Sequence, residues 1–243
     1  MSRCLVSKKI NFSASLNLKL LGESAGGASV HYLCLFEQSR ELFVRAIIMS
    51  GTSFSKQWTL VPRTHCEKFA QVLSRKLGWS GSKCDSKGML EYLENASAFD
   101  IVEQSTTVLS NEEEFGEGII LPFAPCIEPY NSENSLITKD PMLMARTAWS
   151  NEIDILFTGC SFEGIFKAFI KEEVALYYRQ SSPAYIIPLN ELDLQPTDPT
   201  AAEYGERLKS LYYADDQCLA NQESYLKYSS DSIFWHGIYR AVM

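Results

Sequence analysis

The fold of this chain is decided by one stretch near its beginning, Leu20-Leu21-Gly22-Glu23-Ser24-Ala25-Gly26-Gly27-Ala28-Ser29-Val30. Inside it lies a match to G-x-S-x-G, a pattern in which the serine occupies a sharp turn between a strand and a helix. An apolar run at 16–21 precedes the motif, and a run of small and apolar residues at 25–36 follows it. We expect the two glycines of the motif to let the turn pack without a side-chain clash. The pattern predicts a strand ended by Gly22, a turn that presents the Ser24 hydroxyl, and a buried helix.

Further elements follow from the same reasoning along the chain. Short apolar runs at 45–49 and 153–158 predict buried strands of the kind found in parallel sheets. Helical periodicity or capping predicts helices at 64–77, 87–94 and 141–148, and most of the chain after residue 171. The acidic, glycine-containing segment 111–118 reads as a loop. This order of elements indicates an α/β fold with a mostly parallel sheet and helical insertions.

Composition excludes several classes of protein. The chain has 243 residues, 46% of them hydrophobic, which is too apolar for intrinsic disorder. Its longest uncharged run, 24–36, has 13 residues, whereas a membrane-spanning helix needs about 20. The formal net charge of −8 argues against nucleic acid as a partner. No signal peptide is recognisable, because Lys8 and Lys9 occupy the place of its apolar core. We therefore expect a cytoplasmic chain, although a full-length parent could be secreted.

Several ordered segments resemble type B carboxylesterases, the cholinesterase-like α/β-hydrolases. Their residues are most similar to those of insect esterases. The resemblance begins with the stretch quoted above and continues through four later segments, at 42–51, 125–129, 155–164 and 229–240. It implies a single partial α/β-hydrolase domain over residues 1–243, in which 1–19 is a poorly matched lead-in. The first strands of the sheet and the C-terminal part of such a domain would be missing. A sheet of this kind would expose strand edges and an apolar face.

The resemblance also implies a reaction and a set of site residues. Ser24 would be the nucleophile that attacks the carbonyl of a small carboxylic ester, and the N–H of Ala25 would donate to the oxyanion. Glu163 would be the acid that orients a catalytic imidazole; read without the family, it is an exposed loop carboxylate. Glu23 would line the pocket, and Ser50 would supply a hydroxyl behind the nucleophile. No metal or other cofactor is implied.

The chain lacks two expected parts of this machinery. A triad in the order Ser–Glu–His needs a histidine after Glu163, and only His236 follows it, within a segment that reads as a structural helix. His31 should face the fold and His65 the surface. The residues before Ser24 also contain no Gly-Gly pair that could form the family's oxyanion loop. We therefore expect a serine esterase relative that is weak or inactive as this chain. The alternative is a non-catalytic, cholinesterase-like interaction module, or a pseudogene or splice product.

The seven cysteines do not form a disulfide scaffold in a chain of this length, and their odd number leaves at least one thiol unpaired. Cys66 lies at the start of the predicted helix at 64–77, and Cys84 follows its end. They do not both fit the short-loop disulfide of the resembled family, so we expect free, buried thiols at these positions.

Overall fold

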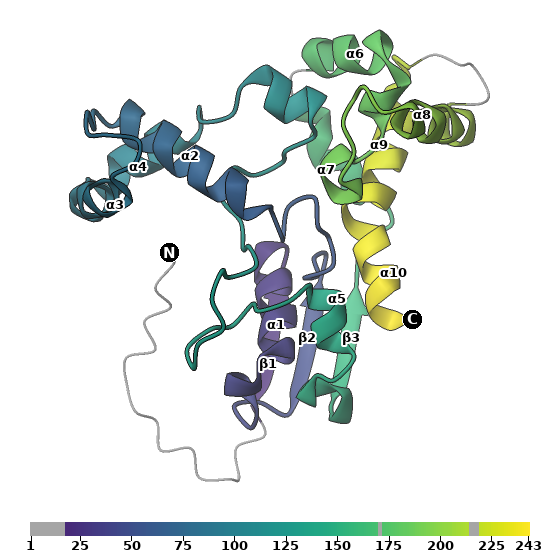
Figure 1. The fold of residues 1–243 in the computed structure, drawn as a ribbon. Helices are drawn as coiled ribbons and strands as arrows, with labels where there is room; N and C mark the ends of the chain where they lie inside the picture. Colours follow the sequence, from purple (N-terminus) through teal and green to yellow (C-terminus); the bar gives the residue numbers. More distant parts are fainter. Residues whose placement is uncertain (1–17, 170–171, 214–218) are drawn as a thin grey trace.

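A computed structural model describes residues 18–169, 172–213 and 219–243, and Figure 1 shows how their elements are arranged. The described strands form one parallel sheet in the order β1-β2-β3: β1 (Lys19–Glu23), β2 (Arg45–Met49) and β3 (Asp154–Thr158). Lys19 lies opposite Arg45, which lies opposite Asp154, so all three strands begin and end at the same level. Their carboxyl ends therefore share one edge of the sheet, where the loops that could carry chemistry emerge.

Helices of three kinds make up most of the rest. The α-helices are α1 (Ala25–Leu35), α2 (Arg63–Lys76), α3 (Ser86–Asn95), α4 (Ala98–Ser105), α5 (Pro141–Ala145), α6 (Glu172–Ser181), α7 (Leu189–Leu192), α8 (Pro199–Tyr212), α9 (Gln222–Ser229) and α10 (His236–Val242). Turns of 3₁₀-helix are η1 (Glu37–Ser39), η3 (Trp149–Glu152), η4 (Glu163–Phe169) and η5 (Pro183–Ile186), and π-helical turns are η2 (Glu112–Gly116) and η6 (Ser230–Trp235). In Figure 1, α2, α3 and α4 extend to one side, and α6 and α8 lie on the other.

One face of the sheet carries the main core. Ala46 and Ile48 of β2 are 2% and 1% exposed and pack against Val30 and Cys34 of α1 and against Trp149. The described residues leave the opposite face open to solvent: Leu21 of β1 and Leu156 of β3 are 59% and 55% exposed. The sequence predicted buried strands, and the structure buries them from one side only. The expected exposure of an apolar sheet face is thus confirmed.

The run from α9 through η6 to α10 braces the loop that follows β2. Trp58 donates its indole N–H to the carbonyl of Ile233 at 3.1 Å, and Gln57 donates its amide to the carbonyl of Ser232 at 2.8 Å. α10 then packs beside β3. The C-terminal helices therefore hold in place the loop next to the ends of the strands.

Most of the predicted elements are confirmed, with shifts at their ends. The first strand was expected at 16–21; residues 16 and 17 lie outside the described part, and the strand continues through Gly22 to Glu23 instead of ending at Gly22. The helix predicted at 141–148 ends at Ala145, because the chain then turns so that Trp149 reaches the core and donates its indole N–H to the carbonyl of Phe36 at 2.9 Å. The helices expected at 25–36, 64–77 and 87–94 agree with α1, α2 and α3 to within one residue at each end.

The segment 111–118 is not the loop that its acidic composition suggested. It contains the π-helical turn η2, which begins after a reciprocal pair of hydrogen bonds. The backbone N–H of Ser110 donates to the Glu113 carboxylate at 2.7 Å, and the N–H of Glu113 donates to the Ser110 hydroxyl at 3.3 Å. Ser110-x-x-Glu113 is a capping box, a signal for a helical start that outweighs the loop-like composition.

Candidate functional site

Ser24 occupies the sharp turn that the motif predicted. β1 ends at Glu23 and α1 begins at Ala25, and the single residue between them has φ 54° and ψ −122°. This backbone conformation is strained for any residue with a side chain, and strain of this kind gathers at functional sites. The backbone N–H of Ser24 donates to the carbonyl of Met49 at 2.9 Å, and its carbonyl accepts from the N–H of Ala28 at 3.0 Å. Its hydroxyl makes no capping bond to the helix, so the side chain is not engaged in holding the turn.

The two glycines of the motif differ in the space that a side chain would find. A Cβ atom at Gly22 would lie 2.2 Å from the carbonyl oxygen of Gly26, whereas a Cβ at Gly26 would meet nothing within 4 Å. Our expectation that both glycines prevent a clash is therefore right for Gly22 and wrong for Gly26. A further glycine, Gly51, packs against the turn from the end of β2, where a Cβ would lie 2.3 Å from the Ser24 carbonyl oxygen. Gly51 is only two residues beyond β2, and no local sequence pattern predicts this contact with Ser24.

Ser50 lies at the end of β2, between the ends of the other two strands. It is 8% exposed and has a φ of 52°, so it shares the positive φ of Ser24. Its N–H donates to the carbonyl of Thr158 at 2.8 Å, just as the N–H of Ser24 donates to Met49. The sheet ladder thus continues one residue beyond β1 and β2, which fixes both serine backbones to the neighbouring strand.

Glu163 opens the 3₁₀ turn η4 that follows β3. Its carboxylate accepts the backbone N–H of Cys160 at 2.7 Å, and the carbonyl of Cys160 accepts the indole N–H of Trp235 at 3.0 Å. The side chain is half-buried and organises its loop, so it is not the free loop carboxylate of the alternative reading. Because β2 lies between β1 and β3, the ends of the two outer strands are roughly 10 Å apart.

Ala25 and Glu23 lie on either side of Ser24 in the chain, and their surroundings differ. Ala25 is the first residue of α1, so its N–H belongs to the first turn, whose donors have no acceptor within the helix. The positive end of the helix dipole is at the same place. Glu23 is exposed on the same side of β1 as Leu21. A cavity of about 300 Å³ lies elsewhere, between the loop that begins at Lys56 and Glu191 of α7, and neither Ser24, Glu23 nor Glu163 lines it.

None of the three histidines serves Ser24 or Glu163 in the described structure. His31 is buried between the rings of Phe54 and Phe157, at centroid distances of 4.7 and 5.2 Å. Its Nδ1 accepts the backbone N–H of Ser53 at 3.2 Å, and burial lowers its pKa from 6.5 to about 3. It faces the fold, as predicted. His65 was expected at the surface but is half-buried, with its ring edge-to-face against Phe69.

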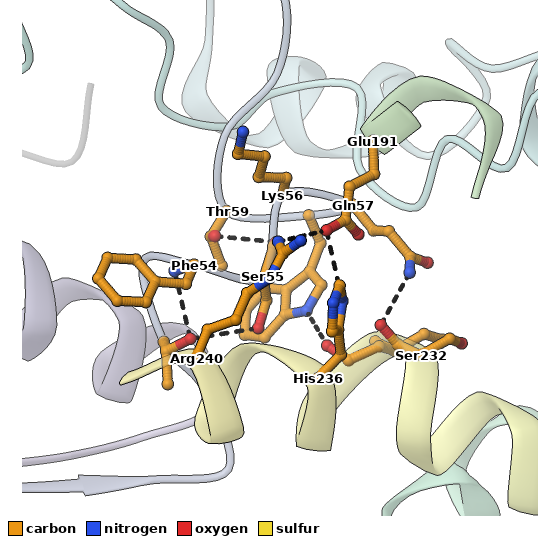
Figure 2. A network of polar contacts seen from close by, with 12 residues as sticks. Phe54, Ser55, Lys56, Gln57, Thr59, Glu191, Ser232, His236 and Arg240 are labelled. Carbon is orange, nitrogen blue, oxygen red and sulfur yellow. Dashed lines mark hydrogen bonds and ion pairs between the residues drawn. The ribbon is translucent and has the colours of Figure 1, made fainter. Parts of the chain in front are cut away.

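His236 takes part in a separate ionic cluster that joins α7 to α10. Figure 2 shows His236 and Arg240 converging on Glu191, whose side chain is only 3% exposed. The Glu191 carboxylate lies 2.9 Å from Arg240 Nη1 and 3.4 Å from His236 Nδ1. Burial, the largest influence, holds the pKa of His236 below its ordinary value against the attraction of Glu191. The cluster makes His236 part of a helix junction, which agrees with its predicted structural role.

Neither a metal centre nor a membrane span is found in the described part of the chain. Within residues 18–169, 172–213 and 219–243, no three His, Cys, Asp or Glu side chains come together in a group that could hold a metal ion. No helix in these ranges is long and apolar enough to cross a membrane. The five cysteines of the described residues are free thiols. Cys84 was expected to be buried, and it is exposed.

Comparison with known proteins gives consistent matches over most of the chain. Residues 15–243 match the Carboxylesterase family, COesterase. Esterase B1 of Culex pipiens is 34% identical over 229 residues, which cover 92% of this chain and 40% of that protein. Cholinesterase 1 of Branchiostoma lanceolatum is 30% identical over 148 residues, 60% of this chain and 39% of that protein. The chain thus spans about 40% of the length of these relatives.

Solved structures show the same partial coverage. Juvenile hormone esterase from Manduca sexta, a structure with OTFP covalently attached, superposes with a TM-score of 0.67 at 24% identity, over 90% of this chain and 39% of that one. PNB esterase superposes with a TM-score of 0.63 at 20% identity, over 92% and 40%. The three parallel strands and their helices are therefore a partial α/β-hydrolase fold, as the sequence predicted.

Proposed function

Because the chain belongs to the carboxylesterase family, we propose that it carries the nucleophile and the acid of a serine carboxylic-ester hydrolase. Ser24 is the proposed nucleophile and Glu163 the proposed acid. The N–H of Ala25 is the proposed oxyanion donor, Glu23 the proposed pocket-lining acid, and Ser50 the proposed hydroxyl behind the nucleophile. The substrates we propose are small aliphatic or aromatic esters, since the name of the matched family specifies no narrower class.

The observation that carries this proposal is the backbone of Ser24. A side-chain-bearing residue at φ 54°, ψ −122° between a strand and a helix costs about 1–3 kcal/mol of strain. Glycine is the residue that adopts such a conformation at least steric cost, so a serine held here indicates a use for its side chain. The turn also sets the Ser24 hydroxyl next to the first N–H groups of α1, where a developing negative charge is stabilised.

The chemistry that fits this geometry is acyl transfer. Ser24 Oγ would attack the ester carbonyl carbon and give its proton to an imidazole, while the carbonyl oxygen becomes an oxyanion near the Ala25 N–H. Collapse of that intermediate would release the alcohol and leave an acyl group on Ser24, which water then removes. Glu163 would keep the imidazole oriented and stabilise it when protonated. The three histidines of this chain are placed elsewhere, so we propose weak or absent turnover for the chain as it stands.

Hydrolysis of 4-nitrophenyl acetate by the purified chain tests this proposal, with Ser24→Ala as reference and Ser29→Ala as matched control. Ser29 is an exposed serine of the same helix, whose hydroxyl bonds the Ala25 carbonyl at 2.8 Å. We expect the same slow release of 4-nitrophenolate from all three proteins. With about 50 mM imidazole added to replace the missing base, wild type and Ser29→Ala should exceed Ser24→Ala. Acetyl should then be found by mass spectrometry on the Ser24 peptide.

Two outcomes would contradict parts of the proposal. Release above the Ser24→Ala level without added imidazole would show that the chain has a working base and is an active esterase. Equal release from wild type and Ser24→Ala with imidazole, and no acetyl on Ser24, would contradict its role as nucleophile. That second result would favour the alternative, a non-catalytic interaction module, for which the engagement of all three histidines away from Ser24 is the supporting observation.

A further inference from the structure

Two cysteines from distant parts of the chain meet beside the first turn of α2. The irregular segment that contains Cys126 runs along the start of this helix, where the N–H of Val61 donates to the carbonyl of Pro125 at 2.9 Å. The Cys66 thiol contacts the carbonyl of Ala124, two residues before Cys126, at 3.7 Å. Burial and then the neighbouring Cys126 raise the pKa of this thiol. Both cysteines are half-buried. The contacts at Pro125 and Ala124 therefore place Cys126 beside the start of α2, next to Cys66.

We propose that Cys66 and Cys126 form an intramolecular disulfide when the chain meets a disulfide oxidant such as glutathione disulfide. One protein thiolate attacks the oxidant, forms a mixed disulfide and releases one glutathione thiolate. The second protein thiol, on losing its proton, attacks the protein sulfur of that mixed disulfide and releases the second glutathione. Two protein thiols are oxidised, and one glutathione disulfide is reduced to two glutathione molecules. The bond brings the two sulfur atoms to an S–S length of about 2.05 Å.

The other cysteines of the described residues provide internal comparisons. Cys34 is 0% exposed and packed in the main core, while Cys84 and Cys160 are exposed. Burial, followed by the neighbouring Cys126, raises the pKa of the Cys66 thiol to about 11. Little Cys66 thiolate exists at neutral pH, so the pair should oxidise slowly there and faster as the pH rises. Exposed Cys84 and Cys160 should instead collect glutathione as mixed disulfides.

The proposed bond would join two walls of the cavity of about 300 Å³. His65, next to Cys66, and Ile127, next to Cys126, both line this cavity, together with Pro62 and Arg63 at the start of α2. Oxidation would tie the helix start to the irregular segment and close a loop of about 60 residues, which constrains the unfolded chain. We therefore expect the oxidised form to unfold at a temperature higher by roughly 5–10 °C.

Peptide mapping of the full chain tests the proposal. The reduced protein is incubated with glutathione disulfide at pH 8.5, blocked with iodoacetamide, digested and analysed without reductant. We expect a peptide pair that joins Cys66 to Cys126, a rise in Tm, and loss of both on treatment with dithiothreitol. Cys126→Ser should abolish the rise in Tm, and Cys84→Ser should leave it unchanged.

The mapping in the wild-type chain does not depend on whether a variant folds. Iodoacetamide on both Cys66 and Cys126, while Cys84 and Cys160 carry glutathione, would overturn the proposal. A bond from either cysteine to a different cysteine would overturn it equally.

Discussion

At the scale of single residues, His31 shows how burial decides what a titratable group can do. It lies seven positions after Ser24 in sequence, yet its ring is 4% exposed and packed between two phenylalanines. The backbone N–H of Ser53 can only donate, so Nδ1 of His31 must be unprotonated and its proton lies on Nε2. The folded structure therefore selects the neutral imidazole, in agreement with a pKa lowered by burial to about 3.

This preference predicts a measurable loss of stability in mild acid. The folded pKa of His31 lies below its unfolded value of 6.5, so the unfolded chain binds the proton first. The contribution of His31 to the free energy of unfolding is fully present above pH 6.5. It falls as the pH drops from 6.5 toward 3, and the loss is about 2 kcal/mol at pH 5. In His31→Asn, urea unfolding should show a difference between pH 7.5 and pH 5 that is smaller by this amount. An unchanged difference in the variant would show that His31 does not titrate in this way.

Ser24 and Glu163 differ in how far the sequence alone defines them. The turn at Ser24 follows from neighbouring residues, because strand, tight turn and helix are encoded in one continuous stretch. Glu163 depends on contacts across the fold: its carboxylate orders a loop whose Cys160 carbonyl accepts from Trp235, 75 positions along the chain. No local pattern predicts such a contact. The Ser24→Ala experiment tests the catalytic role of Ser24, and the catalytic role of Glu163 stays a prediction.

At the scale of elements, the junction of β1 and α1 depends on one glycine of its motif more than on the other. Gly22→Ala would place a methyl group 2.2 Å from the Gly26 carbonyl oxygen, so strand and helix would have to separate. We expect a loss of roughly 2–4 kcal/mol of unfolding free energy. Gly26→Ala is the matched control, because its methyl group meets open space within α1 and alanine favours a helix by up to about 1 kcal/mol over glycine. Urea denaturation of the two variants measures both effects, and equal losses would contradict this difference.

The junction of α7 and α10 rests on the buried Glu191 carboxylate. Arg240→Met removes its closest cationic partner and leaves a charge that is 3% exposed, so we expect a loss of roughly 2–4 kcal/mol. Glu191→Leu combined with Arg240→Met should cost less than the sum of the two single changes, because neither charge is then left unpaired. Lys227→Met breaks an exposed pair with Glu223 on α9, which solvent screens, so it should cost far less than Arg240→Met. Additive losses in the double variant would contradict a coupled ion pair.

The same scale shows where sequence patterns succeed and fail. β2 and α1 were predicted because five-residue apolar runs and small-residue helices are local features. The acidic composition of 111–118 predicts a loop, and that prediction is wrong at η2. The capping box Ser110-x-x-Glu113 is the local pattern that indicates the helical turn. Pro183 and Pro199 lie in the part of the chain predicted to be mostly helical, and they open the helices η5 and α8, since proline suits the first helical turn.

At the scale of the whole molecule, the sheet has one face that the described residues leave uncovered. Leu21, Ile47 and Leu156 lie in register across the three strands, and the outer two are 59% and 55% exposed. The sequence predicted this exposure only through the family resemblance. Residue patterns alone could not predict which face is exposed, because Ile47 on this face and Ile48 on the covered face are equally apolar. A row of this kind, together with unpaired outer edges at β1 and β3 in the described part, favours association between molecules.

This face predicts concentration-dependent association that charge can suppress. Leu21→Lys combined with Leu156→Lys places two charges at opposite edges of the sheet, where both side chains already meet solvent, so the fold should persist. We expect sedimentation velocity at about 5 to 100 μM to show association for the wild-type chain and much less for the double variant. Leu211→Lys is the matched control, because Leu211 of α8 is 71% exposed but lies outside the sheet. If Leu211→Lys suppressed association as strongly as the double variant, net charge rather than the sheet face would be responsible. If the double variant associated like wild type while keeping its circular dichroism spectrum, the uncovered face would not be the surface through which these molecules meet.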